Sequence, residues 1–139
     1  MTPAPDLSGV VPLLQVFDMV EAARFYRDHL GFELVSCSPE VETSEGRFSH
    51  WMWFRRGGAE VMLNTAYDSG ERPTERDERR WSGHADLCLY LGCEDVDAAW
   101  ADLKARGLSP TAPSIAPYGL KRFTVRDPDG YELCFQGPA

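Results

Sequence analysis

The segment Asp18–Gly31, with the sequence DMVEAARFYRDHLG, determines how the rest of the chain is interpreted. Its first residue suits a helix N-cap, and its last suits the left-handed position that follows a helix. The apolar residues that recur at helical spacing are Ala22, Phe25, Tyr26 and Leu30. Because these positions share one side of a helix, the segment predicts an amphipathic helix lying on a sheet.

The pattern recurs at Asp95–Gly107, with the sequence DVDAAWADLKARG. Val96, Ala99, Trp100 and Leu103 fall on one side of this second predicted helix. The strand-like runs that follow the helices are 32–37, 48–54 and 60–65 in the first half, and 118–126 and 131–136 in the second. Each half therefore has the order strand, helix, further strands. The sequence predicts an α+β fold of two βαβββ modules that form an incomplete barrel of mixed sheet around a cleft, with the helices outside.

The whole chain, 1–139, is expected to be one domain, since its length suits a single core. Module one covers about 10–67, a linker covers 68–83, and module two covers about 84–137. The linker carries balanced charge and is interpreted as solvated, with a lid over a pocket as the alternative.

Composition narrows the possible partners. Fourteen basic and 22 acidic residues give a net charge of −8, which disfavours nucleic acid and anionic membranes. The apolar stretch near the N-terminus is too short to span a bilayer and has no basic residue ahead of it, so a soluble, cytoplasmic protein is expected. The four cysteines form no C-x-x-C pair and are interpreted as reduced core thiols, with a disulfide or a soft-metal pair as the alternative.

The strand 48–54 suggests where a ligand could bind. Arg55 to Gly58 is a hairpin signal, and any two- or four-residue turn there pairs odd positions of this strand with even positions of the next. Trp51 and Trp53 would then share a face with Glu60, Met62 and Asn64. The opposite face would carry His50, Met52, Phe54, Val61 and Leu63. The second face suits a helix, whereas the first mixes aromatic and polar groups, as ligand pockets do.

Asp18–Gly31 and the ending Val125–Leu133, which contains Asp127-Pro128-Asp129-Gly130, resemble the vicinal oxygen chelate superfamily. This superfamily includes glyoxalase I, bleomycin-resistance proteins, fosfomycin-resistance enzymes and extradiol dioxygenases. The resemblance covers about 10–137 and is closest to the metal-free members that are similar to bleomycin-resistance proteins. Because many chemistries share the scaffold, the function depends on the site itself.

The resemblance also implies where a divalent metal would be held in the enzymes of the superfamily. The matching positions here are Val11, Met62, Cys88 and Cys134. None of them is a histidine, glutamine or carboxylate, so hard-metal chemistry is not expected. A two-cysteine site for a soft ion stays open. The rival interpretation is a metal enzyme with ligands elsewhere, for instance His84, Glu60, Glu132 or His50.

Strand alternation selects the remaining candidates. The predicted ligand-binding residues are Trp51, Trp53, Met62, Asn64, Cys88, Tyr90, Tyr118, Glu132, Cys134 and Gln136. Glu132 is also the one weak candidate for a general base, because a desolvated carboxylate has a raised pKa. Asp86 follows the same logic as a possible contact. His29 is expected to have a surface role.

These residues favour a homodimeric protein that binds and sequesters a small aromatic or cationic molecule, without a metal or other cofactor and without catalysis. The alternative is a metal-dependent lyase, isomerase or dioxygenase of the same superfamily. A third interpretation is a dimerising scaffold whose pocket is filled by its own side chains.

Overall fold

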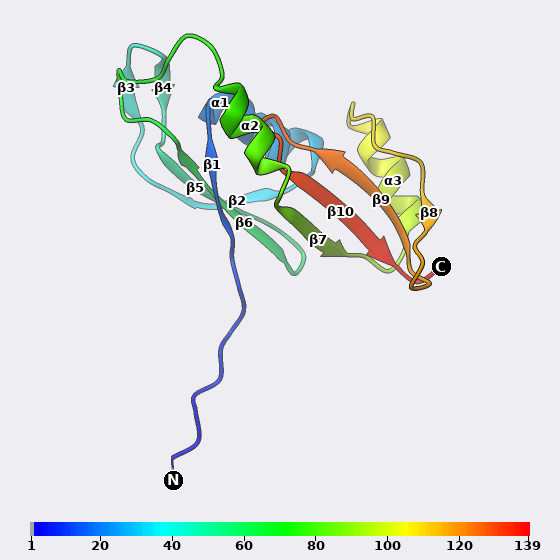
Figure 1. Ribbon diagram of the computed structural model, residues 1–139. Coiled ribbons are helices and arrows are strands. Elements are labelled where there is room, and N and C mark those ends of the chain that lie inside the picture. The colour runs from blue at the N-terminus through cyan, green and yellow to red at the C-terminus, as the bar shows by residue number, and fades with distance from the viewer. Residues whose placement is uncertain (1) are drawn as a thin grey trace.

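A computed structural model describes residues 2–139 and shows two four-stranded mixed sheets. The first half contains β1 (Leu13–Val16), α1 (Met19–Arg24), η1 (Phe25–His29), β2 (Glu33–Cys37), β3 (Val41–Thr43), β4 (Gly46–Phe48), β5 (Trp51–Arg56) and β6 (Ala59–Thr65). The second half contains α2 (Glu78–His84), β7 (Cys88–Gly92), α3 (Val96–Ala105), β8 (Ser114–Ile115), β9 (Lys121–Arg126) and β10 (Glu132–Gly137). The two sheets lie side by side, and α2 lies between their upper parts (Figure 1).

The sheets have the same topology. Their strand orders are β1-β6-β5-β2 and β7-β10-β9-β8. β1 pairs in parallel with β6, and β7 pairs in parallel with β10. All other neighbouring strands in the two sheets are antiparallel. The α+β prediction is therefore confirmed, and the strand order explains the repeat that is visible in the sequence.

Both predicted helices begin and end as their sequences indicate. The side chains of Asp18 and Asp95 accept hydrogen bonds from the backbone N–H groups of Glu21 and Ala98 at 3.2 and 3.0 Å. Gly31 and Gly107 follow the helices with φ values of 74° and 96°, the left-handed region that favours glycine. The first helix continues beyond Arg24 as the π-helical turn η1, which the sequence did not predict.

Four other short elements were not predicted. Strands β3 and β4 form a separate hairpin, β8 has two residues, and α2 lies within the segment that was interpreted as a linker. Helix α2 has an N-cap at Asp77 but no buried residue. It therefore lacks the apolar periodicity by which the other helices are recognised.

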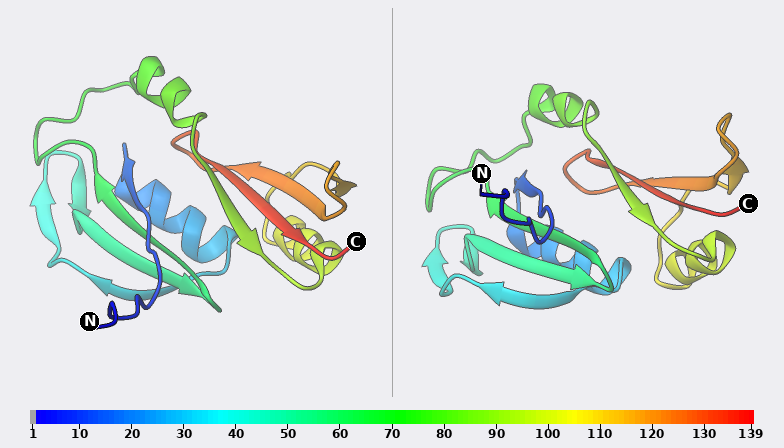
Figure 2. Two further views of the ribbon diagram at one scale, coloured as in Figure 1. Left: turned by 60° about the horizontal axis from the view of Figure 1, so that its bottom comes forward. Right: turned by 90° about the horizontal axis from the view of Figure 1, so that it is seen from below.

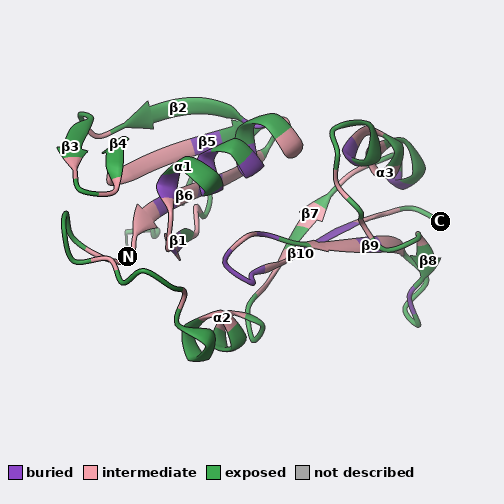
Figure 3. Cartoon of the chain, turned by 90° about the horizontal axis from the view of Figure 1, so that it is seen from above, coloured by how far each residue is buried: buried purple, intermediate pink, exposed green. Residues whose placement is uncertain are grey.

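The helices lie on the inner sides of the sheets. Helix α1 packs on β6, and α3 packs on β9 and β10. One buried core, including Leu14, Phe54, Leu63, Leu103, Phe123 and Leu133, continues across both halves. Figure 2 shows α1 beside the first sheet, on the side toward the second, and α3 beside the second sheet near the C-terminus, and Figure 3 shows buried residues on parts of α1, α3, β5, β6 and β10. The predicted incomplete barrel with outer helices is thus not formed by one chain, because apolar burial against the helices joins the two halves.

The Asp127–Gly130 turn between β9 and β10 locks the second half to the first. Asp127 Oδ1 accepts hydrogen bonds from the backbone N–H groups of Asp129 and Tyr131 at 2.9 and 3.0 Å, and its Oδ2 accepts from the Tyr26 hydroxyl at 2.7 Å. Asp129 Oδ1 accepts from the backbone N–H of Phe17 at 2.8 Å. Buried polar groups that are paired in this way fix one arrangement of the two halves.

Within residues 2–139, no helix has the length and apolar character that crossing a bilayer requires.

Candidate functional site

The outer side of the first sheet carries the two tryptophans. Trp51 pairs with Asn64 and Trp53 with Met62, and Gly57 and Gly58 form the two-residue turn between the strands. This register has the predicted parity, with odd positions of β5 opposite even positions of β6. The tryptophan face is defined here as Trp51, Trp53, Glu60, Met62 and Asn64, all half-buried. Phe54, Val61 and Leu63 on the other side are buried, as predicted.

Polar contacts at one end of the tryptophan face orient Trp53. Its Nε1–H donates to Glu60 Oε1 at 3.1 Å, and the Arg55 guanidinium donates to the same oxygen at 3.0 Å. Arg55 also lies 5.7 Å from the Trp53 ring centroid. Glu60 therefore already has two partners, and these contacts hold the indole ring in one orientation, with the Arg55 guanidinium over one side of it.

The outer side of the second sheet carries the remaining predicted residues. Glu132 pairs with Cys88, and Cys134 with Tyr90, across β10 and β7. The tyrosine face is defined here as Cys88, Tyr90, Tyr118, Arg122, Glu132, Cys134 and Gln136. Tyr90 and Tyr118 are exposed by 54% and 56%, whereas Cys134 is buried beneath its neighbours.

The groups of the tyrosine face contact one another. Tyr118 Oη donates to Gln136 Oε1 at 2.8 Å, and Arg122 Nη1 donates to Tyr118 Oη at 3.5 Å. Arg122 was missed in the sequence analysis, although alternation along β9 could have placed it opposite Gln136. At the other end of this face, Arg126 Nη2 lies 3.4 Å from Glu132 Oε2. This ion pair argues against Glu132 as a general base.

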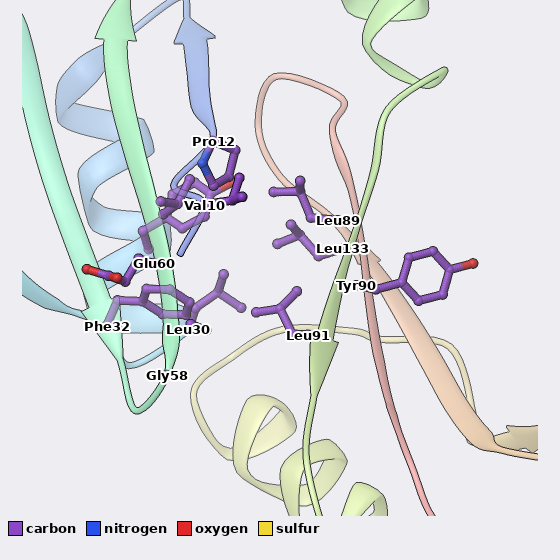
Figure 4. A pocket seen from close by; sticks show the side chains of 13 residues that line it. Val10, Pro12, Leu30, Phe32, Gly58, Glu60, Leu89, Tyr90, Leu91 and Leu133 are labelled. Carbon is purple, nitrogen blue, oxygen red and sulfur yellow. The ribbon is translucent and has the colours of Figure 1, made fainter. Parts of the chain in front are cut away.

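The two faces point in opposite directions. Glu60 extends from the first sheet away from the second, and Tyr90 extends from the second sheet away from the first (Figure 4). The ten predicted ligand-binding residues are therefore separated within one chain. Trp51, Trp53, Met62 and Asn64 lie on one side, and Cys88, Tyr90, Tyr118, Glu132, Cys134 and Gln136 lie on the other.

Between the two halves lies an apolar cavity of about 210 Å³. Leu89, Leu91 and Leu133 of the second half extend toward Leu30 of the first (Figure 4). Tyr26 also lines the cavity, but its hydroxyl already donates to Asp127. The cavity could take a small apolar group but offers few polar contacts to orient it.

The histidines take part in structural contacts. His84 is the last residue of α2, and its Nδ1 lies 2.6 Å from the backbone oxygen of Asp129. Its ring stacks on Tyr131 with centroids 4.0 Å apart. His50 Nε2 lies 2.8 Å from Ser69 Oγ, and His29 Nδ1 lies 2.6 Å from the Arg106 backbone oxygen near the surface, as expected for His29.

A family model for the glyoxalase/bleomycin resistance protein/dioxygenase superfamily matches residues 10–135. The chain belongs to this superfamily. The match confirms the family to which the two sequence motifs pointed, and it covers both sheets. A comparison with curated protein sequences gave no match.

Solved structures of the superfamily have the same overall fold. TnmS3, an antibiotic binding protein from Streptomyces sp. CB03234, is 28% identical, with a TM-score of 0.65 over 98% of this chain and 100% of TnmS3. A glyoxalase/bleomycin resistance protein from the same strain is 29% identical, with a TM-score of 0.58 over 90% of this chain and 96% of its own. The bleomycin-binding protein of Streptomyces verticillus, complexed with copper(II)-bleomycin, is 20% identical, with a TM-score of 0.69 over 98% and 100%.

The residues at the metal-binding positions of the superfamily do not fit a hard divalent ion. Met62 lies on the tryptophan face with Val11 just ahead of β1, whereas Cys88 and Cys134 lie on the tyrosine face. Burial, followed by the Glu132 charge, raises the pKa of Cys88 to about 11, and burial also raises the pKa of Cys134. Thiols that stay protonated at neutral pH bind metals weakly. In the part of the chain from 2 to 139, no three histidine, cysteine or acidic side chains converge as a metal site.

Proposed function

We propose that the chain binds and sequesters a small aromatic molecule without a metal and without chemical turnover. The observation that carries this proposal is the pair of outer faces, one aromatic and one rich in hydrogen-bonding groups, neither of which presents a catalytic cluster. The antibiotic-binding and bleomycin-binding functions of the similar proteins are consistent with it.

A ligand could contact both faces only if two copies of the chain met. The tryptophan face of one copy would then oppose the tyrosine face of its partner, giving a homodimer with two equivalent clefts. An aromatic wall opposite a wall rich in hydrogen-bonding groups suits a flat molecule with a polar edge. Each ring stacked on a tryptophan would contribute about 0.5–1.5 kcal/mol beyond the burial of its apolar area. Micromolar affinity requires about 8 kcal/mol in total, so burial of the ring surface would supply most of it.

Thermal shift assays with a panel of fused-ring aromatic compounds, neutral and charged, test this proposal. At least one compound should raise the Tm, and Trp53→Ala should weaken its binding about tenfold or more. Gly58→Ala, a change at an open turn position, is the control and should bind like the wild type. The proposal fails if no compound stabilises the protein, or if the Trp53→Ala variant binds as well as the wild type.

Elemental analysis of protein purified without chelators tests metal independence separately. The protein should contain less than a tenth of an equivalent of Mn, Fe, Ni or Zn. About one equivalent per chain, lost in Glu132→Ala, would instead support the metal-dependent enzyme.

A further inference from the structure

The tyrosine face has three rows of side chains across β7, β10 and β9, and only one row contains a cation without a matching acid. The register of the strands defines the rows. In the first row, Cys88, Glu132 and Arg126 contact one another, and the Glu132 carboxylate balances the Arg126 charge. The middle row contains Tyr90, Cys134 and Thr124, which are uncharged. The last row contains Gly92, Gln136 and Arg122.

Arg122 forms no ion pair with any residue in the described range 2–139. Its guanidinium contacts only the Tyr118 hydroxyl, at 3.5 Å, and lies 5.7 Å from the centroid of that ring. In a chain of net charge −8, a half-exposed arginine in a row of the tyrosine face that contains no carboxylate is a local positive site.

The neighbours of Arg122 also leave hydrogen-bond donors for a ligand. Tyr118 directs its proton to Gln136 Oε1, so the Gln136 side chain can still donate through Nε2. The Tyr90 hydroxyl has no hydrogen-bond partner among residues 2–139, and it is 54% exposed. Gly92 has no side chain, so this end of the face is open. The groups that remain available are donors, and they favour an acceptor such as a carboxylate or sulfonate.

We infer that Arg122, with Gln136 and Tyr90, binds an acidic group on the ligand. This inference rests on the proposed function, since the aromatic part of the same ligand would stack on the tryptophan face of a second copy. It selects an aromatic acid over the cationic compound that the composition and tryptophans alone left open. The planar guanidinium can donate two parallel hydrogen bonds to a carboxylate, which a lysine cannot do.

Three matched fluorescent probes test the inference: anthracene-2-carboxylate, its neutral carboxamide, and 2-(aminomethyl)anthracene. The ring is the same in all three, so differences in Kd report on the substituent. The carboxylate should bind the wild type at least tenfold more tightly than the carboxamide, and the amine should bind more weakly than the carboxamide. The advantage of the carboxylate should decrease at higher salt concentration.

The variants separate the role of Arg122 from folding and from general charge. Arg122→Gln should bind carboxylate and carboxamide equally, with its carboxamide affinity unchanged from the wild type. Arg122→Lys should retain part of the difference. Arg27→Gln changes the net charge equally, on an exposed helical position paired with Asp28, and should behave like the wild type.

The possible outcomes distinguish the inference from the proposed function. If the carboxamide binds as tightly as the carboxylate, or the amine binds best, or Arg122→Gln keeps the difference, the inference is wrong while sequestration of aromatic compounds stands. If none of the three probes binds the wild type, both proposals fail.

Discussion

Asp127 is a carboxylate that is 4% exposed and that supports the contact between the two halves. Burial raises its pKa from the ordinary 3.8 to about 7, although hydrogen bonds from Tyr26 and from the backbone oppose the shift. The folded protein therefore binds this proton more strongly than the unfolded chain does. The stabilisation is present below about pH 4 and is lost as the pH rises through 7.

Asp127→Asn should reduce this pH dependence. In the wild type, raising the pH from 4 to 7 lowers the free energy of unfolding through Asp127 by up to about 1.4 kcal/mol for each pH unit. The asparagine oxygen can still accept the two backbone hydrogen bonds, but the side chain cannot ionise. Urea unfolding at several pH values should show a shallower slope for the variant. Asp86→Asn, at an exposed carboxylate, should keep the wild-type slope; equal slopes in all three proteins would contradict the prediction.

Gly130 is a second residue whose identity the fold requires. Its φ is 87°, and a Cβ at this position would lie 2.7 Å from the Trp81 backbone oxygen. Gly130→Ala should therefore lower the free energy of unfolding by about 1–3 kcal/mol, measured by urea denaturation. Gly58→Ala meets nothing within 4 Å and should change stability by less than about 0.5 kcal/mol. Similar losses in both variants would show that the close approach to Trp81 is unimportant.

Among the elements, α2 and the residue just before it connect the two halves. Just before the helix, Arg76 contacts Asp129 at 2.9 Å and Glu21 at 2.7 Å. Within the helix, the Trp81 indole donates to the Pro128 backbone oxygen at 3.2 Å. Because α2 has no buried residue, these polar contacts hold it in place.

Arg76→Met should loosen α2. The variant leaves the buried Asp129 carboxylate without its cation, at a cost of about 1–3 kcal/mol. Amides of residues 78–84 should exchange hydrogen faster than in the wild type, while those of β5 and β6 should stay protected. Arg79→Met, at an exposed position of the same helix, is the matched control. Unchanged hydrogen exchange in the Arg76→Met variant would mean that other contacts hold α2 in place.

The sequence predicted the elements that follow a simple period and missed those that do not. The caps at Asp18 and Asp95 and the face shared by Trp53 and Met62 depend on local rules, and these predictions were correct. Helix α2 was missed because its contacts are made by polar side chains with the distant Asp127–Gly130 turn. Periodicity within a segment carries no information about such contacts.

At the scale of the whole molecule, alternation identified which residues share a face but not which way each face points. The direction depends on how the halves pack, and that follows from long-range contacts such as Tyr26 with Asp127. Strand alternation alone therefore predicts one cleft lined by both faces, whereas the structure separates them. The composite cleft of two copies remains a proposal.

Mixing two defective variants tests this composite cleft. Trp53→Ala and Arg122→Gln should each reduce binding of anthracene-2-carboxylate when present alone. In a mixed dimer, one cleft contains both substitutions and the other contains neither. After an equal mixture has re-equilibrated, about half of the dimers are mixed. About a quarter of all clefts should therefore bind like the wild type. Titration by fluorescence measures this recovery. If binding does not recover although the chains are shown to exchange, then Trp53 and Arg122 lie in the same wall of the cleft or in unrelated sites.

The opposed orientation of the two faces also has a thermodynamic consequence. A ligand that contacts both chains of a dimer links ligand binding to dimerisation. The factor by which the ligand strengthens dimerisation must then equal the factor by which dimerisation strengthens ligand binding. In dilute solution, the bound compound would stabilise the dimer, and its concentration would determine the fraction of chains that are dimeric.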